Sequence, residues 1–133
     1  MIKGNLLLRC DSAVMISPEL YRQVVAPADE LVLAALGGGI HSCGRVDHVV
    51  PEMLGLPSVQ CMDFGQSHLN AVDALYAIAR RRRIPLLRIQ ATRRELETAS
   101  ILERFPTGVS LWYHAESADD AKTLFEAYLK ASR

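Results

Sequence analysis

Short apolar runs of strand length alternate along the chain with longer segments whose apolar residues recur at helical spacing. An apolar run of four to seven residues bounded by turn residues favours a strand, and a period near 3.6 favours a helix. We expect strands at 6–9, 39–43, 58–64, 84–90 and 108–114, with another extended piece at 13–16. We expect helices at 17–36, 46–54, from 67 or 70 to about 83, at 92–105, and from 117 to about 129.

Several of the expected helices have recognisable start signals. Residues 17–19 read Ser-Pro-Glu, which places a capping hydroxyl, a proline and an acidic group at a helix N-terminus. Residues 92–95 read Thr-Arg-Arg-Glu, which has the spacing of a capping box. Pro27 lies inside the first expected helix and should kink it, because proline lacks one backbone donor.

The alternation of strands and helices predicts an α/β fold of five β/α units in one domain over residues 1–133. Strands separated by helices pair in parallel through right-handed crossovers. Two architectures fit this order, an open doubly wound sheet and part of a (β/α)8 barrel. A complete barrel takes about 250 residues, so we expect a chain of 133 residues to form at most an incomplete barrel by itself.

Composition narrows the classes of function. Fifteen basic residues balance fifteen acidic ones, which argues against nucleic acid or an acidic membrane surface as a partner. No apolar run reaches membrane-spanning length, and the first residues do not have the pattern of a signal peptide. The three cysteines have no regular spacing and do not suggest a disulfide framework, so we expect a reducing, cytoplasmic environment.

The strongest chemical signal is His41-Ser-Cys43-Gly, at the end of the second expected strand. Residues i and i+2 of a strand point to the same side, so imidazole and thiol should project together. Both are good zinc ligands. The alternative is a buried cysteine beside a hydrogen-bonded histidine.

The segment around this pair resembles a known superfamily. Residues 11–22 read Asp-Ser-Ala-Val-Met-Ile-Ser-Pro-Glu-Leu-Tyr-Arg, Pro27 follows, and residues 38–44 read Gly-Gly-Ile-His-Ser-Cys-Gly. This succession resembles the uroporphyrinogen decarboxylase superfamily, which includes cobalamin-dependent methyltransferases that move methyl groups to thiols. The resemblance implies a (β/α)8 barrel of which this chain is the C-terminal part, strands four to eight.

The same resemblance carries implications for the site. The arginine and aspartate that decarboxylases use lie in the N-terminal units, so the likeness favours zinc methyltransferases, with a corrinoid carried by a partner protein as methyl donor. In those enzymes a His-x-Cys pair, matched here by His41 and Cys43, binds zinc with a later cysteine. That cysteine is absent here, and His114 is the substitute we expect, with Glu116 next. Zinc would activate a small-molecule thiol.

Two carboxylates complete the expected site. Asp11 and Asp63 follow or end strands, where catalytic groups of barrels lie, and one of them would orient the substrate. Asp11 could instead cap a local turn. Cys10 and Cys61 are expected in the core, and Arg88 is expected to pair with a substrate carboxylate or to form a salt bridge to a neighbouring helix.

Two other functions stay open at this point. One is a non-catalytic half-barrel that assembles with itself or with a complementing N-terminal half, because both edges of a five-stranded parallel sheet are open. The other is a module that binds a tetrapyrrole or corrinoid without chemistry.

Overall fold

The strands form one parallel sheet whose spatial order follows the sequence. The computed structural model describes residues 6–133, and its strands lie in the order β1-β2-β3-β4-β5. They are β1 (Leu6–Arg9), β2 (Gly38–Ser42), β3 (Met62–Phe64), β4 (Leu86–Gln90) and β5 (Val109–Trp112). Each neighbouring pair is parallel. The expected α/β fold with five parallel strands alternating with helices is confirmed, as an open sheet.

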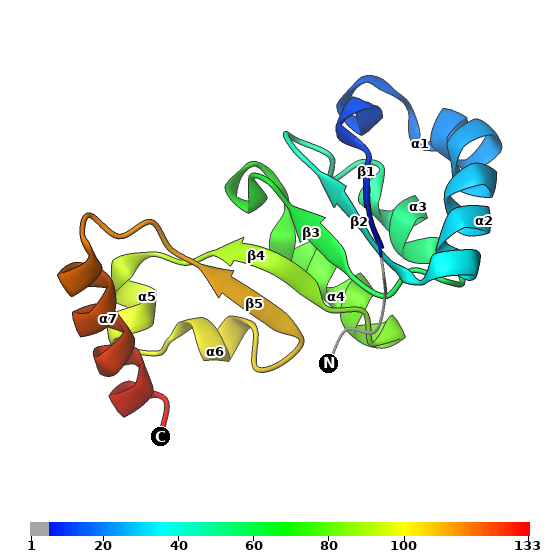
Figure 1. The fold of residues 1–133 in the computed structure, drawn as a ribbon. Coiled ribbons are helices and arrows are strands. Elements are labelled where there is room, and N and C mark those ends of the chain that lie inside the picture. The colour runs from blue at the N-terminus through cyan, green and yellow to red at the C-terminus, as the bar shows by residue number, and fades with distance from the viewer. Residues whose placement is uncertain (1–5) are drawn as a thin grey trace.

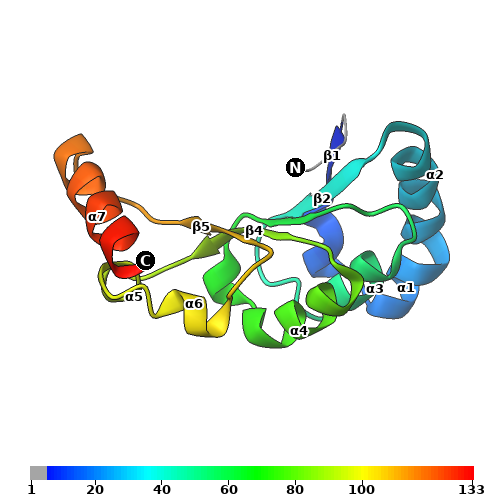
Figure 2. The same ribbon diagram turned by 90° about the horizontal axis from the view of Figure 1, so that it is seen from below.

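The helices lie along one side of this sheet. They are α1 (Pro18–Leu20), α2 (Ala26–Leu36), α3 (Val50–Gly55), α4 (Val72–Arg82), α5 (Arg93–Glu97), α6 (Ile101–Arg104) and α7 (Ala118–Ala131) (Figure 1). Right-handed crossovers between sequential strands place successive helices on the same face. Figure 2 shows α3, α4 and α6 on one side of the curved sheet, with α2 and α7 at its two ends. A doubly wound sheet would have helices on both faces, so the single helical layer resembles a segment of a barrel wall.

The core lies between the sheet and this helical layer. Strand residues that face the helices alternate with residues that face away. The residues of the first set are at most 2% exposed: Ile40, Met62, Phe64, Leu86 and Ile89. The opposite side, which we call the open face, carries His41 and Asp63.

Several expected elements have other bounds in the structure, and the third strand, expected at 58–64, is only Met62–Phe64. Three further differences have a local reason. Residues 13–16 are not extended, because Asp11–Met15 form a 3-10 turn. The helix expected at 46 begins at Val50, since Pro51 is tolerated in a first helical turn but not deeper in a helix. The helix expected at 92–105 is divided into α5 and α6 at Ala99, whose φ is 53°.

Pro27 interrupts the first expected helix, and the residues just before it form a π-helical turn. Tyr21–Val25 form that turn, and the Ala26 N–H donates to the Tyr21 carbonyl five residues earlier. A regular α-helix would need an N–H on Pro27 and would bring its ring against the carbonyl of Gln23. The π turn supplies the extra backbone just before the proline, so the chain continues directly into α2.

Capping follows the expected chemistry. The Ser17, Thr92 and Ser117 side chains each accept a backbone N–H at the start of a helix. Thr92 and Glu95 form the complete capping box. Within residues 6–133 no helix is both long and apolar enough to cross a bilayer.

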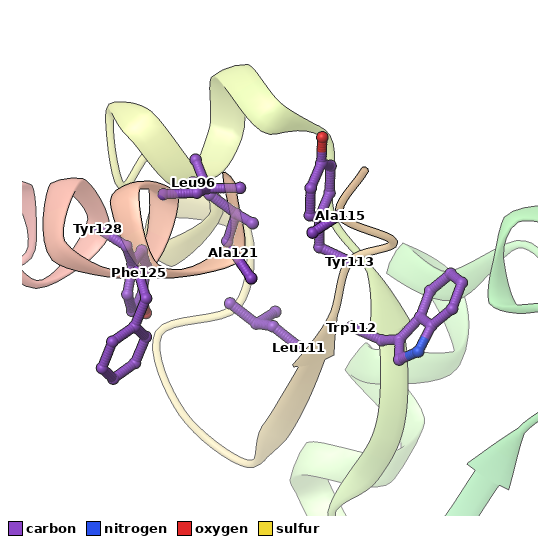
Figure 3. A pocket seen from close by; sticks show the side chains of 9 residues that line it. Leu96, Leu111, Trp112, Tyr113, Ala115, Ala121, Phe125 and Tyr128 are labelled. Carbon is purple, nitrogen blue, oxygen red and sulfur yellow. The ribbon is translucent and has the colours of Figure 1, made fainter. Parts of the chain in front are cut away.

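The last helix covers its end of the sheet incompletely. Leu124 of α7 is buried, whereas Phe125 is 61% exposed. A hollow of about 280 Å³ lies between α5, β5 and α7 and is lined by Leu96, Leu111, Trp112, Tyr113, Ala115, Ala121, Leu124, Phe125 and Tyr128 (Figure 3). In Figure 3 the Trp112 side chain lies on the other side of β5 from Leu111, which places it on the open face.

Candidate metal site at the carboxyl end of the sheet

The register of the first three strands brings the candidate residues together. Arg9 of β1 pairs with His41 of β2, and His41 pairs with Asp63 of β3. Asp11 follows β1 by two residues, and Cys43 directly follows β2. The carboxyl ends of parallel strands meet at one edge of a sheet, so these four side chains converge there.

Three of them form a group of metal-ligand type. Ligand atoms of Asp11, His41 and Cys43 all lie within 4.8 Å of one another. His41 Nε2 is 3.3 Å from Cys43 Sγ and 3.6 Å from Asp11 Oδ1. Tetrahedral zinc with ordinary bond lengths would hold sulfur and nitrogen about 3.5 Å apart, and nitrogen and oxygen about 3.4 Å apart. The donor set and the two distances from His41 Nε2 therefore fit a zinc ion.

Asp11 is held in place by two donors. Its Oδ1 accepts the Cys43 N–H at 3.0 Å, and its Oδ2 accepts Arg9 Nε at 2.6 Å. The hydrogen bond from Arg9, followed by that from the Cys43 amide, lowers the pKa of the Asp11 carboxyl. A carboxylate that stays ionised is ready to coordinate a cation. The Cys43 donor lies 32 residues along the chain, so the structure does not show the local turn cap that the sequence also allowed for Asp11.

Asp63 contacts His41 from the other side of the ring. Asp63 is only 6% exposed, and its Oδ2 lies 2.8 Å from His41 Nδ1. Metal-binding histidines commonly donate their second ring N–H to a carboxylate, which fixes the ring and its tautomer. Asp63 occupies that position beside His41, and the substrate-orienting role expected from the sequence stays a prediction.

Arg88 contacts both Asp63 and His41. Its Nε and Nη2 donate to the two Asp63 oxygens at 2.6 and 2.7 Å. The hydrogen bond to Asp63 is the main cause that raises the pKa of Arg88. Arg88 forms a salt bridge, but its partner Asp63 lies on strand β3 and not on a neighbouring helix as expected.

Cys43, His41 and Asp63 could also support nucleophilic chemistry. A thiol 3.3 Å from Nε2 of a histidine whose Nδ1 faces a carboxylate is the order of groups used by cysteine nucleophiles. Asp11 distinguishes the two interpretations, because a second carboxylate aimed between the thiol and the imidazole favours a cation.

The structure does not bring His114 together with His41 and Cys43. His114 follows β5, and its ring lies 6.3 Å from that of Trp112. Two strands separate β5 from β2, which at ordinary strand spacing corresponds to about 14 Å along the sheet. Glu116 follows β5 in the same way, where its backbone N–H donates to Asp120.

The other two cysteines have the environment that the sequence predicts. Cys61 is 3% exposed, and Cys10 packs against the core. Burial is the main cause that raises the pKa of both thiols. Neither is part of the three-residue group.

Two site residues were not singled out from the sequence. A Cβ on Gly65 would lie 2.5 Å from Cys43 Sγ, so only glycine leaves room for the thiol in this position. Gln66 accepts the backbone N–H of Gly44 through its side chain. The available signal was a glycine directly after a strand, which often marks a close approach.

A polar hollow adjoins the site on the open face. It measures about 270 Å³ and is lined by Gly65, Gln66, Ser67, His68, Arg88, Gln90 and Trp112. None of the three ligand residues lines this hollow, but Gly65 lies against Cys43 and Arg88 contacts His41, so the hollow is next to the site. It also includes His68, which lies in the short turn Ser67–Leu69 before α4.

No protein-family profile, curated protein or solved structure matches this chain.

Proposed function

We propose that Asp11, His41 and Cys43 bind one zinc ion. The observation that carries this proposal is the mutual approach of their ligand atoms within 4.8 Å at the carboxyl edge of the sheet. Thiolate and imidazole together favour zinc among the common divalent metals. Two anionic ligands, Asp11 and Cys43, would balance the charge of the ion.

The geometry favours a catalytic over a structural ion. Structural zinc sites have four protein ligands, whereas catalytic sites have three and leave one position for water or substrate. Three ligands converge here beside a polar hollow, which agrees with the second type.

The reaction we propose is methyl transfer to a thiol, as the resemblance of residues 11–44 to zinc methyltransferases implies. Zinc, when bound, lowers the pKa of a coordinated thiol so that it is a thiolate at neutral pH. The substrate sulfur would attack a methyl carbon carried by a corrinoid protein. A sulfur–carbon bond would form as the cobalt–carbon bond of the partner's corrinoid broke, and the electron pair of that bond would stay with cobalt.

The residues of this chain have separable tasks in that scheme. Asp11 and Cys43 supply negative charge to the ion, and Asp63 keeps the His41 ring oriented. Arg88 and His68 line the hollow that would receive the acceptor. The open edges β1 and β5 support the related proposal that the sheet assembles with a second copy or with complementing β/α units.

The first test is the metal content of purified protein by plasma mass spectrometry. We expect about one zinc per chain in the wild type, and loss of that zinc in Cys43→Ser, His41→Ala and Asp11→Ala. His114→Ala and Cys61→Ala are matched controls that should keep the metal, and His114→Ala also tests the ligand expected from the sequence.

Protein that stays metal-free after exposure to zinc under reducing conditions would refute the proposal. Visible absorbance of a copurifying tetrapyrrole or corrinoid would instead support a cofactor-binding module.

A further inference from the structure

Arg88 reaches the open face because β4 contains an irregularity. Leu86 pairs with Val109 and Ile89 pairs with Leu111, so three steps along β4 match two steps along β5. Leu86 and Ile89 both face the core, and the extra residue turns Arg88 away from it. Without this bulge Arg88 would share the buried face of Leu86, because residues two apart in a strand point the same way.

The bulge holds Arg88 in an unfavourable backbone conformation. Its φ is 58°, in the left-handed region that non-glycine residues rarely adopt. The Arg88 N–H donates to the Ser110 side chain at 2.9 Å. Bulges beside active sites often re-aim one side chain, and strain of this kind persists where the surrounding structure enforces it.

The re-aimed guanidinium is the fixed end of a chain of contacts that reaches the thiol. Arg88 donates two hydrogen bonds to Asp63, and Asp63 faces His41 Nδ1. Arg88 Nη2 also lies 2.8 Å from His41 Nδ1. The two contacts of Nδ1 call for opposite tautomers, because the Asp63 carboxylate only accepts and the Arg88 guanidinium only donates. Arg88 Nη2 already donates to Asp63 Oδ2 at 2.7 Å, and metal-binding histidines commonly donate to a carboxylate, so we assign the Nδ1 proton to the contact with Asp63. His41 Nε2 is then unprotonated and faces Cys43 and Asp11.

We infer that Arg88 is a positioning residue of this site, which acts through Asp63 to hold the His41 ring with Nε2 directed at the ion. The inference rests on the proposed zinc site. It assigns Arg88 to the ligand geometry and not to the substrate, although its side chain also borders the polar hollow.

The test compares Arg88→Met, Arg88→Lys, Asp63→Asn and the double variant Arg88→Met/Asp63→Asn. The matched control is Arg104→Met, since Arg104 also donates two hydrogen bonds to one aspartate, Asp73, but on the helical side of the protein. Zinc affinity is measured by chelator competition, and ligand geometry by the visible spectrum of the cobalt-substituted protein.

Removing a group that orients a metal ligand commonly weakens affinity by about 10- to 100-fold. We expect about 10-fold weaker zinc binding in Arg88→Met and an altered cobalt spectrum, with Arg88→Lys intermediate because lysine keeps the charge but not the paired donors. The double variant should bind no more weakly than Asp63→Asn, because Arg88 acts through Asp63. Affinity losses that multiply, or an Arg88→Met protein indistinguishable from Arg104→Met, would overturn the inference.

A second readout does not depend on metal. Long-range proton–nitrogen NMR of the His41 ring in the metal-free protein, in alkaline buffer, should show the proton on Nδ1 in wild type and Arg104→Met. Arg88→Met and Asp63→Asn should show a mixture of both tautomers. If the wild type binds no zinc, the metal proposal fails, and this ring pattern alone decides the role of Arg88.

Discussion

Gly65→Ala should remove metal binding although it replaces none of the proposed ligand residues. The added Cβ would lie 2.5 Å from Cys43 Sγ, 3.2 Å from Cys43 Cα and 3.3 Å from Cys43 Cβ. Ordinary contacts between such atoms are about 3.5–4 Å. The sulfur therefore has to move by about 1 Å, and rotation of the Cys43 side chain is the smallest movement that achieves this.

That displacement is large for a metal site and small for the fold. Metal–ligand distances are fixed to about 0.2 Å, so a shift of about 1 Å takes the thiolate out of the site. Loss of a ligand exceeds the loss of an orienting group, and we expect at least about 100-fold weaker zinc binding, or about 2.7 kcal/mol. The destabilisation of the fold should be about 1–2 kcal/mol, the lower part of the range for overpacking.

The assay is chelator competition for zinc, with the free energy of unfolding from urea titration. Gly55→Ala is the matched control, because a Cβ there meets nothing within 4 Å. It should keep the wild-type affinity and gain up to about 1 kcal/mol of stability. If Gly65→Ala fails to fold, Gly65→Ala/Cys43→Ala should restore folding by removing the sulfur. Wild-type zinc affinity in a folded Gly65→Ala would refute the reasoning.

Four further predictions test the fold itself. Arg83→Gly should raise the free energy of unfolding by about 1 kcal/mol in urea titration, since Arg83 ends α4 with φ 58° and glycine favours that conformation; a decrease would contradict this. Tyr21→Phe should lower it by about 1.5–3 kcal/mol, because the buried Tyr21 hydroxyl donates to Asp29 at 2.7 Å. Burial raises the pKa of Asp29, so its contribution to stability is complete below the unfolded-state pKa and is lost as pH rises through the folded-state pKa. The measurement is the free energy of unfolding of the wild type relative to that of Asp29→Asn as a function of pH. If this difference increases as pH rises through the folded-state pKa of Asp29, the prediction is wrong. Gly39→Ala should prevent folding, as judged by circular dichroism, because its Cβ would lie 2.4 Å from the Cys61 carbonyl oxygen as well as 2.3 Å from the Cys61 sulfur. Adding Cys61→Ala should not restore folding, because the backbone oxygen stays in place. Restored folding would show that the two strands can move apart.

The sequence was sufficient where the signal is local. The period of apolar residues predicted five strands and their helices, and the capping residues Ser17, Thr92 and Ser117 act as expected. The i, i+2 spacing of His41 and Cys43 predicted that imidazole and thiol lie side by side, and they are 3.3 Å apart. Each of these inferences needs only backbone geometry over a few residues.

The tertiary structure decided what depends on register between strands. Asp11 joins the pair because β1 is placed so that Arg9 lies beside His41, and Asp63 contacts the ring because β3 is placed so that it lies opposite. His114, chosen from the sequence by chemical type, lies across two intervening strands. The bulge that turns Arg88 toward Asp63 shifts the pairing of β4 by one residue, and an alternating pattern does not reveal such a shift. The residues of the site thus follow from local sequence, but their assembly follows from strand pairing, which joins residues that lie more than twenty positions apart.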